Sequence, residues 1–396
     1  PAGKMAFFVL GTADPTYIPP GDGLGRAPVF FAGQHRYRPT GLQVPVLRRA
    51  GNFAKYQLHR LSRVGGLIRE ACTAGYECKA DVVWAVLDSP MVIHIARAVA
   101  ERLSVPLLSQ VWDPPDYLCL NEQIDTWSAR FVRRDFGAVL RASSRCAVVS
   151  EAMQQAYRTE FGVDTILLHY GLERRLWHGP ATAPQSGNRL MIGFAGSPYA
   201  KNEWRALIQA LDRVGWRVGK RTVTLRLLGQ AVPFTTQVPA QAEFLGWRPL
   251  PETIKRLAEA DVLYLPYWFD SLHRSTVRYS FPTKVPTYLA AGRPILYHGP
   301  RDSSVACFFS EHPAAASCHS VEPEDILKVL RSIVEDETAY RQMAHAGRAV
   351  LEDRFSEQAF RAQLARFVGI DQKSLRPISA PSGTISAQCM RQVSGP

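Results

Sequence analysis

Basic and hydroxyl side chains gather in the segment YWFDSLHRSTVRYSFPTK, which precedes the short apolar run VPTYLAAG. Asp270 is the one acid among them. Loops longer than about a dozen residues in compact domains are often functional. Cations and hydroxyls that converge on a helix start suit a diphosphate, and Pro286 fits the first helical turn. The segment therefore predicts a diphosphate site, and the alternative is a solvated loop that is merely basic. Its predicted binding residues are His273, Arg274, Arg278, Ser280, Thr283 and Lys284.

A second candidate for an anion site is the stretch GSPYAKNEW, which follows the apolar run LMIGFA. Gly196 allows a tight exit from a strand, and Ser197 offers a hydroxyl and a backbone N–H. Lys201 lies at the predicted start of a helix, where the helix dipole also favours negative charge. The alternative is an ordinary loop with a surface lysine. Two such loops in one half of the chain favour the anion site.

The elements that must position these loops alternate between strands and helices. Continuous apolar runs predict strands buried on both faces, and apolar residues at helical spacing predict the helices. This alternation is typical of βαβ units and parallel sheets. In the first half the predicted strands are 6–10, 29–33, 42–47, 82–87, 106–112, 146–150 and 165–170, and the predicted helices are 53–71, 91–103, 125–141 and 151–161. In the second half the predicted strands are 190–195, 222–228, 242–246, 261–266 and 314–318, and the predicted helices are 203–214, 251–259, 284–291, 303–311 and several within 323–368.

A change of composition divides the chain. Residues 179–188, GPATAPQSGN, lack periodicity and predict a linker. We therefore expect an N-terminal domain over 1–178 and a C-terminal domain over 189–370. Both would be Rossmann-like, doubly wound α/β domains that face each other across a cleft at the carboxyl ends of their sheets. The polar residues 371–396 are predicted to be a tail with little structure.

The overall composition limits the function classes. The 396 residues, 46% hydrophobic, fit two globular domains, and no apolar run approaches the roughly 18 residues of a membrane span. A net charge of +12 fits an attraction for nucleic acid, an anionic membrane surface or small phosphorylated substrates. The arginines are scattered and no RNP or zinc-finger motif is present, so we expect no nucleic-acid partner.

The cysteines predict a reducing compartment. There are seven, without a CxxC pair, so buried thiols are expected rather than disulfides or a zinc site. The start PAGKMAFFVLG is too short for a signal peptide. We therefore predict a cytoplasmic protein, and its basic charge is compatible with peripheral contact with an anionic membrane at the inner face.

Several motifs resemble family 4 glycosyltransferases, in the same order along the chain. SFPTKVPTYLAAGRPIL resembles the nucleotide-sugar-binding helix, and IGFAGSPYAKN lies where the family has its phosphate loop. AVVSEAMQQAYRTEFGVDTILLHYGLE resembles the segment that ends the first domain. Further matches are VTLRLLGQ, EFLGWRPLPETIKRLAEADVLYLPYW and RFSEQAFRAQLARFV. The resemblance covers about 145–368, and the earlier part matches mainly in the rhythm of its elements.

The resemblance implies the GT-B architecture and a retaining transfer of a sugar from a nucleotide-diphosphate donor. Lys201, Arg278 and Lys284 would neutralise the departing diphosphate. Segments 228–230 and 246–248 would hold the base, and the first domain would bind the sugar or glycoconjugate acceptor. No cofactor or metal is expected, because no carboxylate pair flanks the phosphate loops. The predicted donor-binding residues are Gly196, Ser197, Asn202, Gly229, Trp247, His273, Arg274, Arg278, Ser280, Thr283 and Thr287.

The chain departs from the family pattern at important positions. The Glu-x7-Glu signature would place carboxylates where Tyr279 and Thr287 stand, and the second Glu usually holds the ribose hydroxyls. A threonine can make one such hydrogen bond but cannot accept two as a carboxylate does. Ser197 replaces the arginine of the phosphate loop, and Lys201 comes one residue early. Two alternatives stay open: an inactive GT-B homologue that acts as a binding subunit, and a GT-B nucleotide-sugar epimerase.

In the first domain the notable stretch is SQVWDPPDYL, in which Asp113 follows a predicted strand. The resemblance places Asp113 near the donor sugar, where it would orient a sugar or acceptor hydroxyl. The alternative is a helix cap or turn former. By analogy, GDGLG (21–25) would be the mobile glycine loop near the reaction centre. The predicted catalytic residues are thus Asp113, Lys201 and Lys284. Three histidines without metal-ligand spacing are predicted to be structural: His35, His169 and His298.

Overall fold

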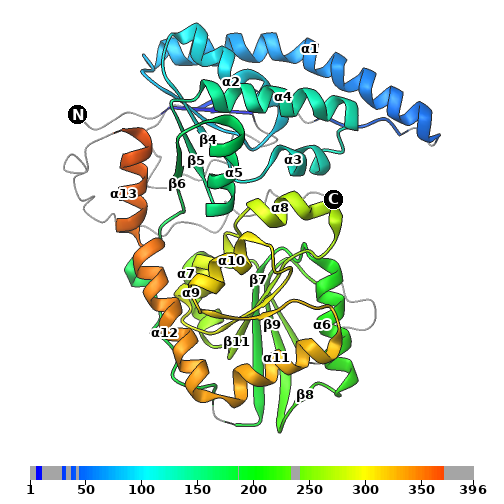
Figure 1. The fold of residues 1–396 in the computed structure, drawn as a ribbon, viewed down its shortest axis with the longest axis vertical. Coiled ribbons are helices and arrows are strands. Elements are labelled where there is room, and N and C mark those ends of the chain that lie inside the picture. The colour runs from blue at the N-terminus through cyan, green and yellow to red at the C-terminus, as the bar shows by residue number, and fades with distance from the viewer. Residues whose placement is uncertain are drawn as a thin grey trace. The chain divides into compact units, whose positions relative to one another are not determined.

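The structure, a computed structural model, describes residues 6–10, 29–32, 37–41, 44–185, 187–232 and 241–369 (Figure 1). They form two compact units. The first comprises the described residues up to Leu168 and those from Gln363 onward, and the second runs from His169 to Ala362. The predicted glycine loop 21–25, the predicted tail 371–396 and His35 lie outside the described residues.

The first unit contains a parallel sheet in which the strands follow the order β3-β4-β5-β6, and a separate parallel pair β1-β2. Serine side chains cap the starts of α2 and α5. Ser89 and Ser150 accept hydrogen bonds from Val92 N and Met153 N. The strands are β1 Phe7–Val9, β2 Val29–Phe31, β3 Val83–Val86, β4 Leu107–Gln110, β5 Arg145–Val148 and β6 Thr165–Leu167. The helices are α1 Pro45–Glu77, α2 Pro90–Leu103, α3 Pro115–Asn121, α4 Thr126–Ala142, α5 Glu151–Phe161 and the end of α13 Glu357–Val368.

Most of the predicted elements of this unit are present, and one prediction is wrong. The described part of 42–47, predicted as a strand, enters helix α1 at Pro45. The physical reason is that a proline at the first helical position loses no hydrogen bond and has a φ suited to the helix. Helix α3 was not predicted, because PDYLCLN is too short to show helical periodicity.

The second unit contains one sheet. Its strands β10-β9-β7-β11-β12-β13, in that order, are parallel to one another, and β8 pairs antiparallel with β9. The five strands predicted for this half are all observed, and β12 is a sixth parallel strand of the sheet. The strands are β7 Arg189–Gly196, β8 Arg217–Val218, β9 Arg221–Gly229, β10 Ala242–Gly246, β11 Val262–Pro266, β12 Ile295–His298 and β13 Ala315–Cys318. The helices are α6 Lys201–Arg213, α7 Leu250–Ala258, α8 Arg274–Tyr279, α9 Lys284–Ala290, α10 Ser304–Glu311, α11 Pro323–Glu335, α12 Glu337–Arg354 and the start of α13, with 3-10 turns η2 Arg174–Leu176 and η3 Ser271–His273.

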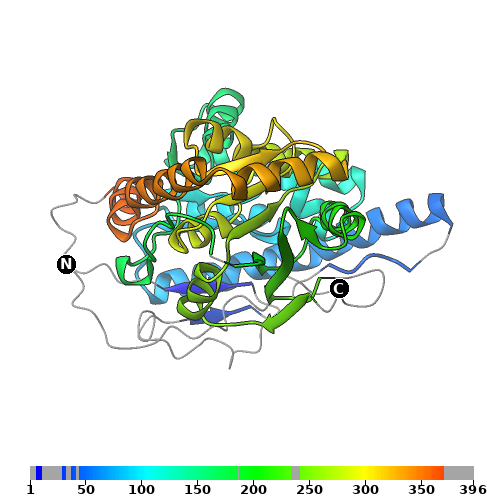
Figure 2. The same ribbon diagram turned by 90° about the horizontal axis from the view of Figure 1, so that it is seen from below.

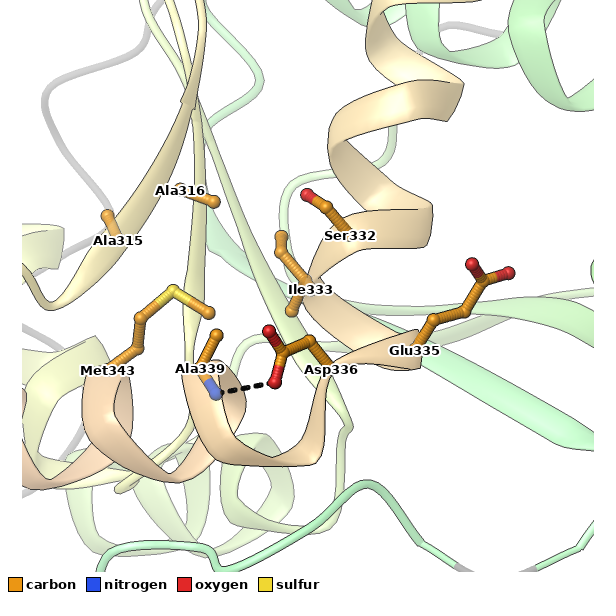
Figure 3. Close-up of a pocket in the computed structure, with 8 residues that line it drawn as sticks. All are labelled: Ala315, Ala316, Ser332, Ile333, Glu335, Asp336, Ala339 and Met343. Atoms are coloured by element: carbon orange, nitrogen blue, oxygen red, sulfur yellow. Dashed lines mark hydrogen bonds between the residues drawn. The ribbon is translucent and has the colours of Figure 1, made fainter.

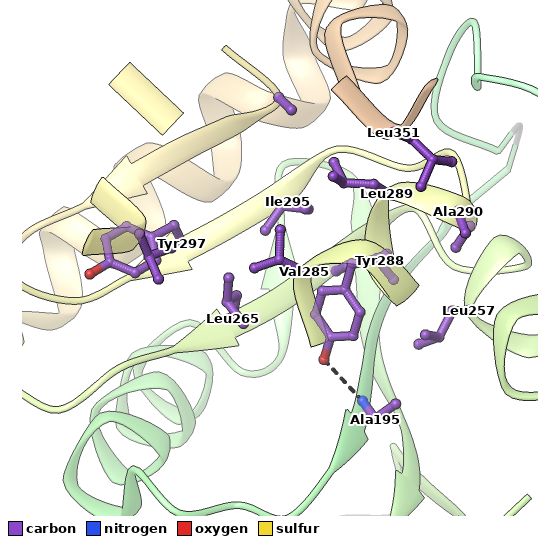
Figure 4. Close-up of a cluster of buried hydrophobic side chains, with 14 of the residues drawn as sticks. Ala195, Leu257, Leu265, Val285, Tyr288, Leu289, Ala290, Ile295, Tyr297 and Leu351 are labelled. Atoms are coloured by element: carbon purple, nitrogen blue, oxygen red, sulfur yellow. Dashed lines mark hydrogen bonds between the residues drawn. The ribbon is translucent and has the colours of Figure 1, made fainter. Parts of the chain in front are cut away.

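Helices cover both faces of this sheet and bury two apolar clusters. One cluster packs α7, α9 and α10 against the strands and includes Val285, Tyr288 and Leu289 of α9 (Figure 4). The other packs α6 and α11 against the opposite side chains of the strands, such as Phe194 and Leu225. Because the strands are parallel, the loops that follow β7, β9, β10 and β11 all leave the sheet at one edge.

The predicted linker 179–188 runs along the second unit. His178 N donates to Ala290 O at 2.8 Å, and Ala181 N donates to Gly292 O at 2.9 Å. Gln185 N donates to Asp261 Oδ1 at 2.6 Å. The chain thus passes from the first unit to the second at Leu168–His169, before the predicted boundary at 178, and residues 363–369 group with the first unit rather than with the second.

Candidate functional site

Two glycines end neighbouring strands at the carboxyl edge of the second unit. Gly196 ends β7 with φ +107°, and Gly229 ends β9 with φ +103°, both in the region that side chains rarely adopt. A Cβ on Gly229 would lie 2.7 Å from Gly196 O. Gln230 N donates to Gly196 O at 3.2 Å. The two backbones therefore approach so closely that this corner needs glycine at both positions.

Lys284, the first residue of α9, reaches into this corner. Its Nζ lies 3.4 Å from Ser197 O, to which it donates, and 4.1 Å from the ring centroid of Tyr199. A Cβ on Gly196 would lie 2.8 Å from Lys284 Cε, so a side chain at position 196 would clash with Lys284 and glycine does not. Burial lowers the pKa of Lys284 to about 7, because the charged amine loses its hydration. Its described neighbours are a carbonyl and the rings of Tyr199 and Phe194 rather than a carboxylate, and this arrangement favours an incoming anion.

Helix α9 is held in place by a tyrosine that joins it to two strands. Tyr288 OH accepts a hydrogen bond from Ala195 N at 3.0 Å and donates one to Tyr264 O at 3.2 Å (Figure 4). Tyr288 is fully buried, so the contact is shielded from water. The position of Lys284 therefore follows from the core and not from a loose surface contact.

Several of the hydroxyl-bearing residues in 280–287 already form hydrogen bonds within the protein. Tyr170 OH donates to Thr283 O at 2.5 Å and lies 3.0 Å from Thr287 Oγ1. Thr287 is buried, whereas Thr283 is exposed. Ser280 is also buried, and its carbonyl accepts hydrogen bonds from Tyr267 OH at 3.2 Å and from the hydroxyl of Ser304. The predicted site residues Ser280 and Thr287 thus contribute to the packing around α9.

The segment after β11 folds into an aromatic cluster. The ring of Trp268 stacks on His273 with centroids 4.3 Å apart and an interplanar angle of 4°. Asp270 Oδ1 lies 2.8 Å from His273 Nδ1 and accepts a hydrogen bond from His273 N at 3.1 Å. Trp268 Nε1 donates to Tyr199 O at 3.2 Å, which joins this cluster to the loop after β7. The segment predicted as a long loop contains the 3-10 turn η3 and helix α8.

A buried carboxylate on α6 holds the loop that follows β11. Glu203, in the first turn of α6, is 1% exposed, and its Oε1 accepts a hydrogen bond from Phe269 N at 2.8 Å. Among the described residues its Oε2 has no hydrogen-bond partner. Desolvation raises the pKa of Glu203 above its usual value. Glu203 O also accepts from Tyr264 OH at 3.0 Å, so α6, β11 and the following loop are linked.

The remaining predicted donor residues lie around this edge at different depths. Lys201 and Asn202 are exposed at the start of α6, where Arg205 Nη1 donates to Asn202 Oδ1 at 3.0 Å. Arg278 is exposed on α8 with its guanidinium carbon 5.6 Å from the ring centroid of Tyr279. Arg274, also exposed, begins α8, and half-buried Trp247 follows β10. The structure thus brings the glycines, Ser197 and Lys284 together and leaves these cations on the surface of the same unit.

Asp113 belongs to the first unit, whereas the other predicted site residues belong to the second. It is half-buried between β4 and α3. Burial raises the pKa of Tyr117, and the charge of Asp113 raises it further. Of the histidines predicted to be structural, His298 is buried and burial lowers its pKa to about 4. Its ring lies 2.7 Å from Tyr264 OH and 2.8 Å from Ser320 O. His169 is buried against the rings of Phe281 and Phe355.

Sequence reasoning missed the aromatic and acidic residues that position Lys284. Tyr199 and Trp268 were visible as aromatic residues inside two predicted loops, where solvation alone would not favour them. Tyr288 and Glu203 gave no such indication, because a tyrosine in an apolar helix and a glutamate in a first helical turn are both ordinary. Their roles depend on contacts between segments far apart in the sequence.

One pocket of about 440 Å³ lies elsewhere on the second unit, between β13, α11 and α12 (Figure 3). Alanine and isoleucine side chains form part of its lining, with Glu335 and Asp336 at its side. It contains none of the predicted site residues. Within the described ranges, no group of three or more His, Cys, Asp or Glu side chains is placed to hold a metal ion.

No protein-family model and no curated protein sequence matches the chain. Solved structures do match its fold. Anabaena Alr3699/HepE, in a complex with UDP, has a TM-score of 0.59 at 15% identity, over 86% of each chain. Sucrose-phosphate synthase (tll1590) from Thermosynechococcus elongatus has a TM-score of 0.59 at 11% identity, over 78% of this chain and 79% of that one. The α,α-trehalose 6-phosphate synthase from Burkholderia multivorans has 0.55 at 12%, over 86% and 84%. The chain therefore has the α/β fold of the GT-B glycosyltransferases.

Proposed function

We propose that the protein is a glycosyltransferase that binds a nucleotide-diphosphate sugar at the carboxyl edge of its second unit. The sugar is transferred to an acceptor bound by the first unit, with retention of the anomeric configuration as in the family 4 enzymes that the sequence resembles. Lys284 is the main contact to the diphosphate. Lys201, Arg274 and Arg278 are the surface cations that complete it. No metal is assigned to the reaction.

The observation that carries this proposal is the corner formed by Gly196, Gly229 and Lys284. The two glycines let the ends of β7 and β9 and the side chain of Lys284 approach closely, so an amine of lowered pKa lies beside backbone groups at the carboxyl edge of the sheet. A half-buried lysine without a carboxylate beside it is costly to keep charged, so a bound diphosphate would restore the charge and the stability that desolvation removes. The position of the Lys284 amine beside a ring and a carbonyl therefore fits the binding of a diphosphate.

The fold likeness supports the choice of ligand class. Anabaena HepE, of the same fold, was solved with UDP and with UDP-glucose. We infer that UDP and its sugars are the first donors to try for this chain. Segments 228–230 and 246–248, including Trp247, remain the assigned contacts to the base.

In the mechanism that we propose, the leaving group receives most of the stabilisation. The acceptor hydroxyl oxygen bonds to the anomeric carbon as the bond between that carbon and the diphosphate breaks, and the acceptor proton passes to the departing diphosphate. Negative charge grows on the diphosphate oxygen during this step. A protonated Lys284 close to that oxygen stabilises it, and one such group is typically worth on the order of 3 kcal/mol of transition-state stabilisation. Asp113 is assigned to orient a hydroxyl of the sugar or of the acceptor.

A second candidate function is a binding subunit without activity. The observation that favours it is the contact between Tyr170 OH and Thr287 Oγ1 at 3.0 Å. The resemblance places a ribose-binding carboxylate at this position, and here a neutral hydroxyl is already partnered by a tyrosine. Such a protein would bind nucleotide weakly or not at all.

The test is thermal unfolding of the protein with UDP-, GDP-, dTDP- and ADP-sugars, followed by an assay of nucleotide release with simple sugar acceptors. Ligand at 100 times its dissociation constant stabilises the folded protein by about 2.7 kcal/mol, which gives a visible shift in Tm. We expect a shift with one base and slow release of its nucleoside diphosphate. No shift with any donor would refute the donor site and favour the inactive homologue, whereas a shift without release under any condition would contradict the transfer activity.

A further inference from the structure

Helix α1 of the first unit has an unusual exposed face. Leu47, Leu58 and Leu61 are 59%, 69% and 72% exposed, and Ala54 is exposed between them. Intervals of seven, four and three residues put these four side chains on one side of the helix. From Leu47 to Leu61 the apolar stripe extends about 21 Å, at 1.5 Å per residue.

The opposite side of the helix is the one that packs. Tyr56 and Leu67 are 1% exposed, and Tyr56 OH lies 2.9 Å from His94 Nε2 of α2. Phe53 contacts Trp127 of α4, with ring centroids 5.8 Å apart. The leucine stripe is therefore not a core surface of this unit. Exposed leucines at regular spacing usually indicate an interaction surface.

The charges beside the stripe have one sign. Every charged side chain between Val44 and Arg69 is basic. Arg48, Lys55 and Arg69 are separated by multiples of seven residues, so they form a row next to the stripe, and all three are exposed. Among the described residues, no carboxylate lies at ion-pair distance from any of the three. A partner of negative charge is therefore favoured.

The shape of this part of α1 suits a flat partner. Figures 1 and 2 show the first turns of α1 extending past the neighbouring helices α2 and α4 of the same unit. Val44 and Val46 at this end are 54% and 75% exposed, next to Arg48 and Arg49. A protruding ridge with apolar and cationic side chains can enter the headgroup region of a bilayer, whereas an apolar groove would suit a helix. No described helix is both long and apolar enough to cross a membrane, so α1 would lie on the surface.

We propose that the exposed face of α1, defined by Leu47, Ala54, Leu58 and Leu61 with the row Arg48, Lys55 and Arg69, docks on an anionic lipid bilayer. The leucines enter the boundary between headgroups and acyl chains, and the cations contact the lipid phosphates. A second copy of the chain is a poorer partner for this face, because each copy carries a net charge of +12. The proposal concerns the first unit and does not depend on the donor site.

The test is co-sedimentation of the full chain with vesicles of phosphatidylcholine alone and with vesicles of equal parts phosphatidylcholine and phosphatidylglycerol. We expect binding to the anionic vesicles only, with an affinity that falls as salt is added. The double variant Leu58→Ser/Leu61→Ser should bind at least about tenfold more weakly, because it loses the burial of two leucines. Arg48→Gln/Lys55→Gln should also bind more weakly and depend less on salt.

The matched control is Val321→Ser, which removes an exposed apolar side chain from the second unit and should bind as the wild type does. All variants change exposed side chains, and circular dichroism checks that they fold. Equal binding to neutral vesicles, no binding by the wild type, or an unchanged Leu58→Ser/Leu61→Ser variant would each overturn the proposal. A concentration-dependent dimer that this double variant abolishes would instead assign the face to a second copy.

Discussion

At the scale of single residues, the site depends on a lysine that the protein holds in a poorly hydrated position. Lys284 has a carbonyl and two rings as its described neighbours, those of Tyr199 and Phe194 at 4.1 and 5.5 Å. Cation–π contacts compensate only part of the lost hydration. Keeping Lys284 charged is therefore unfavourable in the unliganded protein, and a bound anion would make it less so.

This lysine should make the stability of the unliganded protein depend on pH. The pKa of Lys284 is about 7 in the folded protein and near its ordinary 10.5 in the unfolded chain. Between these values the unfolded chain binds more protons, so the free energy of unfolding should rise with pH through this window. Lys284→Met should lack this rise and be more stable at about pH 7. Chemical denaturation of both proteins at a series of pH values measures it, and parallel curves would contradict the lowered pKa.

The two glycines give a prediction on folding stability. Gly229→Ala puts a Cβ 2.7 Å from Gly196 O at a φ of +103° and should lower the free energy of unfolding by about 1–3 kcal/mol. Gly66→Ala in α1 is the control, because its Cβ meets nothing within 4 Å. That substitution should stabilise by roughly 0.5–1 kcal/mol. Urea denaturation measures both, and a harmless Gly229→Ala would show that the corner can relax.

At the scale of elements, the site is built by loops at one sheet edge that α6 and α9 fix from two sides. Tyr288 of α9 joins β7 to β11, and Glu203 of α6 holds the loop that follows β11. The aromatic cluster of Trp268 and His273 then packs on the loop that follows β7 through Tyr199. The loops are thus ordered by contacts made outside their own sequence.

Variants of Glu203 can separate the effect of its buried charge on stability from that of its hydrogen bond with Phe269 N. Its pKa is raised, so its stabilising effect is greatest at low pH and is lost as pH rises through the folded pKa. Glu203→Gln keeps an acceptor for Phe269 N without the buried charge and should be at least as stable as the wild type at pH 7. Glu203→Ala leaves that N–H unpaired and should cost about 1–3 kcal/mol. Thermal unfolding ranks the three proteins, and a glutamine variant as unstable as the alanine variant would contradict the argument.

At the scale of the molecule, the alternation of apolar runs and helical periods was enough to predict two α/β units and nearly every parallel strand. Buried parallel strands need continuous apolar runs, and such runs are visible in a single sequence. The start of α1 at Pro45 was not predicted, because the apolar run over 42–47 also fits a strand. The boundary at Leu168–His169 was missed because residues 179–188 have the composition of a linker while their backbone is bonded to the second unit.

The candidate site was predictable only in part, for a physical reason. Glycines, lysines and hydroxyls near strand ends can be found from their types, and Gly196, Gly229 and Lys284 do meet. Contacts such as that between Tyr170 and Thr283, more than a hundred residues apart in the chain, leave no local pattern. A buried threonine such as Thr287 looks the same in the sequence as one that faces a ligand.

The division into two units predicts where a nucleotide should change the dynamics of the backbone. With UDP present, amide hydrogen exchange should slow in 196–201, 229–232 and 267–284 of the second unit, because these loops would close on the ligand. Helix α1 of the first unit should exchange as before. Mass spectrometry of peptic fragments measures this, and protection confined to the first unit would place the nucleotide elsewhere.

The central claim is that Lys284 binds the diphosphate of a nucleotide, and a calorimetric titration of UDP tests it most directly. At about pH 8 the free amine is mostly neutral, so binding to the wild type should take up a proton, and the heat should vary with the buffer. Lys284→Met should bind roughly 10- to 100-fold more weakly and take up no proton through this residue, since a charged hydrogen bond contributes about 1.5–3 kcal/mol. Equal affinity and equal proton uptake by the two proteins would contradict the account.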